Sequence, residues 1–212
     1  MADVAKLRPL VHKAFTKAHS DSVFAKTHNV LGEAFGVPTV TMEHTVGGIY
    51  VLRNPLDMVM SMSDHYGISL DEAIEMLADP EAGTGNSKSN AFEFYGTWSQ
   101  HVHSWTAEDN DSLIHVRYED MAGKSKQTFA RIAAFLGLSP SKARLEKAIR
   151  FSSFKVLQGQ ERRDGFRERT QHSKQFFRSG KVGIWRSILS EAQVDKVTAD
   201  HHEQMDRFGY LP

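Results

Sequence analysis

An apolar segment that stops at Arg53-Asn54-Pro55 is the feature that most constrains how this chain folds. Residues 46–52 carry the apolar side chains expected of a buried strand. Pro55 suits the first turn of a helix, where its missing N–H group is no loss, and Asp57 lies near the positive end of the same helix dipole. The sequence therefore predicts a buried strand, a tight turn and a helix that runs towards Gly67.

Helical patterns alternate with short apolar segments along the rest of the chain. They predict helices over residues 4–19, 69–77, 92–105, 124–136, 140–150 and 190–207, and further strands over residues 22–25 and 113–116. Residues 79–90 are predicted to form a polar loop, a candidate lid, and residues 151–180 to be irregular and basic. The alternation predicts a single α/β domain over residues 1–212, with three layers, α/β/α, around a short parallel sheet.

Charge and cysteine content exclude several classes of function. Among 212 residues, 26 Lys and Arg balance 26 Asp and Glu. The zero net charge argues against a dedicated nucleic-acid or membrane-surface binder, but not against a local basic pocket for a small anion. Without cysteine there are no disulfides and no thiolate metal sites, and we expect no metal. No apolar run reaches the ~20 residues of a membrane span, and no signal-peptide pattern is found, so we expect a cytoplasmic protein.

Arg53 and Ser61 are candidate anion ligands because of where the predicted strand ends. In an open α/β sheet, ligands bind at the carboxyl ends of strands, where helix N-termini offer free N–H groups. The guanidinium of Arg53 can hold two phosphate oxygens, and Ser61, two helical turns on, can add a hydroxyl donor. The residues alone equally allow that Arg53 pairs with Asp57 and that Ser61 is an ordinary surface hydroxyl.

The same residues give the chain a resemblance to a known family. Arg53-Asn54-Pro55 with Asp57, followed by Ser61 eight residues after the arginine, resembles the 3′-phosphate-binding signature of cytosolic-type sulfotransferases. These enzymes transfer a sulfuryl group from 3′-phosphoadenosine 5′-phosphosulfate (PAPS) to an acceptor. The resemblance implies a fold like that of the P-loop nucleotide-binding proteins, with Arg53 and Ser61 on the 3′-phosphate of the donor. Four further segments match in the family's order.

The first of these segments precedes the signature. Lys26-Thr27-His28 resembles the family's Lys-Thr-His segment, which implies that His28 is the general base and that Lys26 belongs to the catalytic site. A histidine suits the task, because an acceptor hydroxyl is a weak nucleophile until its proton is removed. Taken alone, a histidine among 11 in the chain fits a structural role better.

Two segments follow the signature. Arg117-Tyr118-Glu119-Asp120 resembles the family's Tyr-Glu-Asp segment, which implies that Tyr118 lies near the donor nucleotide. Phe151-Ser152-Ser153-Phe154 resembles a segment in which a serine and an aromatic residue hold the adenine, here Ser152 and Phe154. An aromatic face can stack on a base, although from the sequence alone Phe154 fits a core position as well.

The last segment, residues 176–186, resembles the family's Arg-Lys-Gly-x-x-Gly-x-Trp-Lys motif. The resemblance implies that Arg178, Ser179 and the N–H of Gly180 contact the donor's 3′-phosphate, and that Phe176 and Phe177 before them also belong to the cofactor-binding segment. Glycine allows the close backbone approach that a phosphate requires. The motif departs from the family at Ser179, where a lysine is usual, and at Ile184, where an aspartate is usual.

One part of the family pattern is not found. Family members place a loop of the Pro-Lys-Ser-Gly-Thr-Thr type after the first strand, where it holds the 5′-phosphosulfate, and no such loop precedes His28. Residues 83–89 imitate a phosphate loop, but they follow a helical pattern and have the wrong spacing. We therefore expect a family member without the first strand and phosphate loop. An open sheet edge favours self-association, and a homodimer is one candidate assembly.

Three functions remain open at this point. The first is sulfuryl transfer from PAPS to a hydroxyl or amine of a small-molecule or peptidic acceptor, with His28 as general base. The second is a truncated or non-catalytic member that binds only adenosine 3′,5′-bisphosphate or a protein partner. The third, a nucleotide kinase, is disfavoured because the chain has no Walker-type lysine loop. The pairs His101 with His103 and His201 with His202 are poorly spaced for a metal, and we expect them to be solvated.

Overall fold

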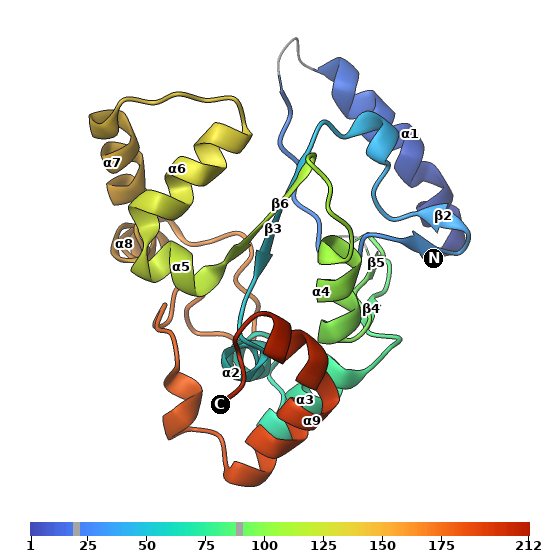
Figure 1. Ribbon diagram of the computed structural model, residues 1–212. Coiled ribbons are helices and arrows are strands. Elements are labelled where there is room, and N and C mark those ends of the chain that lie inside the picture. The colour runs from blue at the N-terminus through green and yellow to red at the C-terminus, as the bar shows by residue number, and fades with distance from the viewer. Residues whose placement is uncertain (19–21, 88–90) are drawn as a thin grey trace. The chain divides into compact units, whose positions relative to one another are not determined.

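Short strands and amphipathic helices alternate in the computed structural model of the chain, which describes residues 1–18, 22–87 and 91–212 (Figure 1). The helices are α1 (Ala2–Ala18), α2 (Pro55–Tyr66), α3 (Leu70–Ala78), α4 (Trp98–Thr106), α5 (Tyr118–Gly123), α6 (Ser125–Phe135), α7 (Lys142–Phe151), α8 (Phe154–Asp164) and α9 (Glu191–Arg207). Two short 3-10 helices are η1 (Met42–His44) and η2 (Ile184–Ser187). The strands are β1 (Glu33–Ala34), β2 (Val37–Pro38), β3 (Gly48–Leu52), β4 (Gly83–Thr84), β5 (Glu93–Phe94) and β6 (Leu113–Arg117).

The strands β3 and β6 pair with each other in a short parallel sheet. The chain between them contains α2, α3 and α4, as expected of a crossover between parallel strands. The predicted α/β class with a short parallel sheet is confirmed. Two small antiparallel pairs lie outside this sheet: Glu33 is opposite Pro38 in β1 and β2, and Gly83 is opposite Phe94 in β4 and β5.

The chain divides into two compact units, each built from segments that are distant in the sequence. The first unit contains Met1–Tyr50, Glu75–His115 and Asp200–Pro212. The second unit contains Val51–Ile74 and Val116–Ala199. The organisation of residues 1–212 as a single domain stays a prediction.

Each unit has apolar side chains that are withdrawn from solvent. In the first unit these include Val30, Phe92, Trp98, Val102, Met205 and Tyr210. In the second unit they include Leu52, Leu56, Val59, Met60, Trp185 and Val197. The inward side chains of α2 are Leu56, Val59 and Met60, which share one face at helical spacing. Burial of this face fixes which way the remaining side chains of α2 point.

The strand predicted over residues 22–25 is wrong. These residues belong to no element, and Val23 and Phe24 are 39% and 76% exposed. Four residues with apolar character do not make a strand unless a partner strand satisfies their backbone groups. Residues 88–90 of the predicted lid, and residue 19 of the first predicted helix, lie outside the described residues, and residues 83–84 of the predicted loop form β4.

The helix predicted over residues 92–105 begins later, at Trp98. Thr97 caps it, because the Thr97 side chain accepts the N–H of Gln100 while the Gln100 side chain accepts the N–H of Thr97. This reciprocal capping box is a strong start signal, and the apolar periodicity upstream of it belongs instead to β5.

The irregular region predicted over residues 151–180 contains a helix, α8. Its inward face is formed by Phe154, Leu157, Gln158 and Glu161, at the spacing i, i+3, i+4 and i+7. Two of these four side chains are polar, so a search for apolar periodicity does not detect the helix. Residues 165–180, which are all described, do lie outside helices and strands, as predicted.

Candidate functional site

The turn between β3 and α2 is fixed by its own side chains. The Asn54 side chain caps α2 by accepting the N–H of Leu56 at 2.9 Å, and Pro55 occupies the first helical turn. The backbone N–H of Asn54 donates to Oε1 of Glu119 at 3.0 Å, which links the turn to the start of α5. Arg53 is therefore held at the end of β3, on a backbone that is constrained from both sides.

Arg53 lies against Tyr118 and donates to the segment near Gly180. Its guanidinium carbon is 4.5 Å from the centroid of the Tyr118 ring, an aromatic–cation contact. Its Nη2 donates to the carbonyl of Lys181 at 3.2 Å. Its Nε is buried and has no hydrogen-bond partner among the described residues. An anion bound here would satisfy this buried donor.

Asp57, the alternative partner for Arg53, has a different role. Its carboxylate is 1% exposed and accepts the backbone N–H of Gly183 at 2.7 Å and that of Trp185 at 3.3 Å. One side chain of α2 thus holds the backbone that follows Gly180. The buried charge is compensated by two hydrogen bonds and by its place in the first turn of the helix.

Gly180 lies between two aromatic side chains. The phenol of Tyr118 donates to the carbonyl of Gly180 at 3.4 Å. A Cβ atom at Gly180 would fall 2.4 Å from Cδ2 of Phe154, and the residue has a left-handed φ of +60°. Both facts require glycine at this position. Arg53, Tyr118, Phe154 and Gly180, from four separate segments, are therefore brought together in the second unit.

The two phenylalanines before Arg178 pack in an aromatic cluster. The ring of Phe177 lies 5.8 Å from that of Phe154 and 5.2 Å from that of Phe176, measured between centroids. The ring of Phe166 is 4.6 Å from Phe176 and 5.0 Å from Phe177. Phe176 and Phe177 thus contribute packing, and Phe154 joins this cluster to Gly180.

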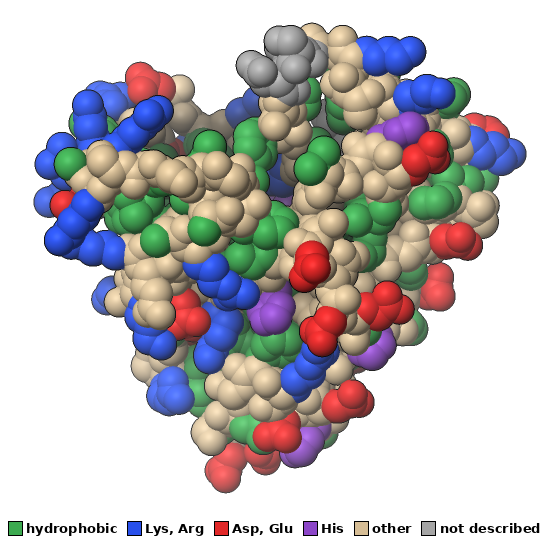
Figure 2. Space-filling model, turned by 45° about the horizontal axis from the view of Figure 1, so that its top comes forward, with side chains coloured by type: hydrophobic (Ala, Val, Ile, Leu, Met, Phe, Trp, Pro, Cys, Tyr) green, Lys and Arg blue, Asp and Glu red, His purple; other side chains and the backbone are tan. Residues whose placement is uncertain are grey.

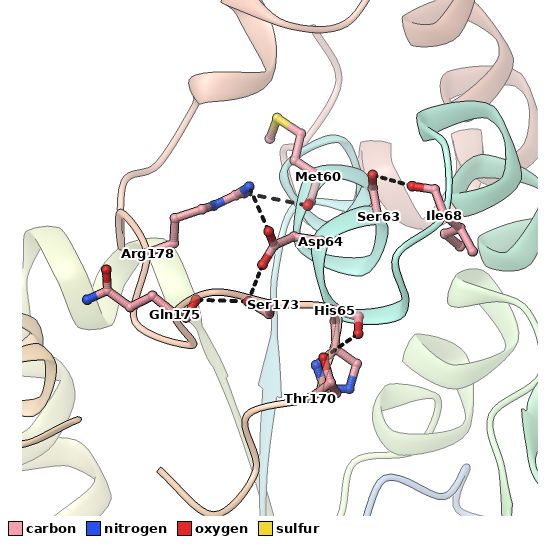
Figure 3. A network of polar contacts seen from close by, with 9 residues as sticks. All are labelled: Met60, Ser63, Asp64, His65, Ile68, Thr170, Ser173, Gln175 and Arg178. Atoms are coloured by element: carbon pink, nitrogen blue, oxygen red, sulfur yellow. Dashed lines mark hydrogen bonds and ion pairs between the residues drawn. The ribbon is translucent and has the colours of Figure 1, made fainter. Parts of the chain in front are cut away.

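Arg178 lies beside Met60 and Asp64 of α2 (Figure 3). Its Nη1 is 3.6 Å from Oδ1 of Asp64, and its Nη2 donates to the carbonyl of Met60 at 3.5 Å. Met60 and Asp64 are neighbours of Ser61 along the helix, and Ser61 itself is exposed. The hydroxyl of Ser173 donates to the other oxygen of Asp64 at 2.6 Å.

The two remaining serines of the predicted site, Ser152 and Ser179, form hydrogen bonds within their own segments. Ser152 is exposed, and its hydroxyl donates to the carbonyl of Ala148 at 2.9 Å within the last turn of α7. Ser179 is exposed, and its hydroxyl accepts the N–H of Lys181 at 3.5 Å. The described contacts do not bring Ser152 to Gly180.

His28 and Lys26 lie in the first unit, in an exposed segment without regular structure. The backbone N–H of His28 donates to Oε1 of Glu93 at 3.1 Å. The His28 ring meets the edge of Tyr95, with centroids 6.5 Å apart. The imidazole is accessible, as a general base for an acceptor must be.

A stacked cluster behind His28 fixes its backbone. Nε2 of His101 lies 3.1 Å from the carbonyl of His28, and Nδ1 of His101 lies 3.0 Å from the phenol of Tyr50. The Tyr50 ring is stacked on Trp105, whose indole N–H donates to the carbonyl of Asn29 at 3.0 Å. Burial lowers the pKa of His101 and raises that of Tyr50. The neutral imidazole therefore donates from Nε2 to His28 and accepts at Nδ1 from Tyr50.

The prediction that His101 and His201 are solvated is wrong. His101 has the contacts just described, and His201 is 2% exposed with its Nδ1 3.0 Å from the hydroxyl of Ser99. Among the described residues, no group of three His, Asp or Glu side chains is arranged to hold a metal ion. No helix in the described ranges is long and apolar enough to cross a membrane.

Charge is distributed unevenly over the chain. Lys and Arg side chains gather over α6, α7 and α8 (Figure 2). Several of those on α7 and α8 are exposed: Lys142, Arg144, Lys147, Arg150, Arg162 and Arg163. The second unit as a whole holds 19 Lys and Arg against 12 Asp and Glu, a net charge of +7. The unit that contains Arg53 and Arg178 therefore has an excess of positive charge.

Comparison with known proteins gives a consistent result. The model of the sulfotransferase domain family matches residues 9–209. Sulfotransferase 1A1 of the dog is 25% identical over 182 residues, which cover 82% of this chain and 59% of the relative. The guinea-pig 3-beta-hydroxysteroid sulfotransferase is 25% identical over 170 residues, which cover 77% of this chain and 57% of the relative. The chain thus spans less than two thirds of the length of these relatives.

Solved structures agree on the fold. Mouse sulfotransferase SULT7A1 complexed with PAP is similar with a TM-score of 0.63 and 23% identity, over 80% of this chain and 61% of the other. Retinol dehydratase in complex with androsterone and the inactive cofactor PAP gives a TM-score of 0.68 and 21% identity, over 91% of this chain and 56% of the other. Because the family model spans nearly all of its residues, the chain belongs to the sulfotransferase domain family.

Proposed function

We propose that this protein transfers a sulfuryl group from PAPS to a hydroxyl or amine of an acceptor. The observation that carries the proposal is the meeting of Arg53, Tyr118, Phe154 and Gly180. These residues come from four segments of the sequence, each of which resembles a donor-binding segment of the family. A chance resemblance would not bring them together in one unit.

The chemistry of these residues fits the 3′-phosphoadenosine part of the donor. The guanidinium of Arg53 and that of Arg178 would bind phosphate oxygens, and the buried, unpartnered Nε of Arg53 would gain an acceptor. Gly180 would offer its backbone N–H, and Ser61 its exposed hydroxyl. The rings of Tyr118 and Phe154 would contact the nucleotide. Ser152, Phe176, Phe177, Ser179 and Lys26 complete the proposed site residues.

His28 would act as the general base. It takes the proton from the acceptor hydroxyl or amine as the acceptor atom bonds to sulfur, and the bond between sulfur and the 5′-phosphate oxygen breaks. The products are the sulfated acceptor and adenosine 3′,5′-bisphosphate, and the imidazolium then returns its proton to water. The hydrogen bond from His101 to the carbonyl of His28 would keep the base at a fixed place in the backbone.

Calorimetric titration with adenosine 3′,5′-bisphosphate tests the donor site. We expect the parent to bind and Arg53→Ala to lose about 1.5–3 kcal/mol, roughly 10- to 150-fold in Kd, the scale of a charge-assisted hydrogen bond. Arg144→Ala, which removes an exposed arginine of α7, is the matched control and should bind like the parent. Equal affinities for all three proteins would contradict the proposed site.

A transfer assay with labelled PAPS tests the reaction. Two of the matched folds are retinol dehydratase structures, in complex with androsterone or retinol, so small alcohols begin the acceptor panel and peptides follow. We expect His28→Gln to abolish transfer and to leave the affinity for adenosine 3′,5′-bisphosphate unchanged, because this nucleotide lacks the sulfuryl group and the acceptor at which the base would act.

A second function is kept because the described residues ahead of His28 contain α1 and no strand followed by a glycine loop. In that case the protein binds adenosine 3′,5′-bisphosphate without transferring the sulfuryl group. Binding by the parent together with no transfer to any acceptor on the panel would favour this non-catalytic role.

A further inference from the structure

Two side chains of α8 hold the backbone immediately before Gly180. The carboxylate of Glu161 accepts the N–H of Phe176 at 2.6 Å through Oε1 and the N–H of Phe177 at 2.9 Å through Oε2. The side-chain amide of Gln158 donates to the carbonyl of Phe177 at 2.7 Å and lies 3.4 Å from that of Arg178. One helix therefore supplies partners for two backbone N–H groups and two carbonyls of this segment.

This arrangement is more than ordinary packing. Glu161 is 6% exposed, and a buried carboxylate is tolerated only when hydrogen bonds replace its water. In a helix or strand, backbone groups pair with each other, but residues 165–183, all of which are described, belong to neither. The conformation of this segment is thus set by the side chains of α8 rather than by its own secondary structure.

The same helix also touches the segment at Gly180. Phe154, the first residue of α8, packs so closely on Gly180 that a Cβ atom there would lie 2.4 Å from its ring. Phe154, Gln158 and Glu161 are spaced by four and three residues, which places them on one face of the helix. One rigid element therefore determines the backbone from Phe176 to Gly180 at three points.

A second helix holds the segment from its other end (Figure 3). Asp64 of α2 accepts the hydroxyl of Ser173 and lies 3.6 Å from Arg178. The hydroxyl of Thr170 donates to the carbonyl of His65 at 2.7 Å. These contacts leave the segment little freedom, so ordering it on binding an anion would cost little conformational entropy.

We propose that Glu161 and Gln158 are positioning residues for the donor's 3′-phosphate: they preset the Phe176–Gly180 backbone so that the Arg178 side chain and the Gly180 N–H face the anion. The inference rests on the proposed function of the same site. Neither residue touches the nucleotide. Each acts through the Phe176–Gly180 backbone, which would contact the nucleotide.

The test is a double-mutant cycle on the affinity for adenosine 3′,5′-bisphosphate. Glu161→Gln keeps the size of the side chain but removes one acceptor, and we expect Kd to rise about tenfold. Gln158→Met removes the donor without burying a charge and should raise Kd by about threefold or more. In an Arg178→Ala background, both effects on Kd should become smaller than in the parent, because the Arg178 side chain through which they partly act is gone while the Gly180 N–H remains. Gln160→Ala, on the exposed side of α8, is the control.

Amide hydrogen exchange supplies a second measurement on the ligand-free protein. The amides of Phe176 and Phe177 should lose protection in Glu161→Gln, while those of α2 keep theirs. If Glu161→Gln does not fold, the affinities of Gln158→Met, Arg178→Ala and the double variant alone test the proposal.

The outcomes are distinguishable. A parent that does not bind the nucleotide overturns the proposed function and the inference with it. A parent that binds, with folded Glu161→Gln and Gln158→Met variants of unchanged affinity, overturns only the inference. Effects of full size in the Arg178→Ala background would show that Glu161 and Gln158 stabilise the fold without positioning the anion ligand.

Discussion

Removing the carboxylate of Asp57 should destabilise the second unit strongly, and the size of the effect follows from the contacts. The two oxygens accept the N–H groups of Gly183 and Trp185, and the residue is 1% exposed. A hydrogen bond to a charged group contributes about 1.5–3 kcal/mol. Asp57→Asn keeps one acceptor oxygen and loses the favourable charge at the helix N-terminus, worth about 0.3–1 kcal/mol. We therefore expect Asp57→Asn to lower the free energy of unfolding by about 2–4 kcal/mol.

Urea denaturation followed by circular dichroism measures this loss, and amide hydrogen exchange locates it. The amides of Gly183 and Trp185 should exchange faster in the variant, because their acceptor is weakened. Asp195→Asn, which removes an exposed carboxylate from α9, is the control and should stay within about 0.5 kcal/mol of the parent. An Asp57→Asn variant as stable as this control, with unchanged exchange at Gly183, would refute the reasoning that the carboxylate organises this backbone.

Three further predictions concern single side chains. Gly180→Ala should lower the free energy of unfolding by about 1–3 kcal/mol and weaken nucleotide binding. Gly137→Ala should show only the smaller cost of its left-handed φ, +69°, since nothing lies within 4 Å of a Cβ atom added there, and urea denaturation of both variants therefore separates the clash from the torsional strain. Burial lowers the pKa of His101, so the contribution of the neutral imidazole to stability is present above about pH 6.5 and is lost as the pH falls through the folded-state pKa. The free energy of unfolding, measured against pH, should therefore fall more steeply below about pH 6.5 in the parent than in His101→Gln. Asp64→Asn should raise the affinity for adenosine 3′,5′-bisphosphate by up to about fivefold, because the half-exposed carboxylate 3.6 Å from Arg178 competes with the anion. Calorimetry at two salt concentrations measures this affinity, and a weaker affinity in the variant would mean that Asp64 orients Arg178 instead.

Local signals made part of the fold predictable. The strand, turn and helix around Arg53 were predicted because a proline at the first helical turn, a buried apolar run and a terminal glycine each act over a few residues. The observed elements are Gly48–Leu52 and Pro55–Tyr66, and Gly67 ends the helix with a φ of +68°. Residues 22–25 had a similar apolar character but no partner strand, and a single segment contains no information about its partner.

The site itself was predictable only in part. Arg53, Tyr118, Phe154 and Gly180 could be identified because each belongs to a segment with a recognisable order of residue types. Glu161 and Gln158 could not, since their partners are backbone groups 15 to 20 residues away, and backbone groups are present at every position whatever the sequence. The same applies to His101, whose acceptor is the carbonyl of His28. Side chains that act on distant backbone have no pattern of their own along the chain.

The zero net charge is the clearest example of a bulk quantity that conceals the chemistry. The second unit has a net charge of +7, so the remaining residues, with 7 Lys and Arg against 14 Asp and Glu, have −7. Charges in physiological salt act over about 8 Å, so an anion near Arg53 and Arg178 experiences the charges close to it rather than the total. A nucleotide that carries two phosphates requires this kind of local excess. The expectation from the total charge that the chain is no dedicated polyanion binder, and the proposal of a phosphate site from local residues, are therefore compatible, because they concern different distances.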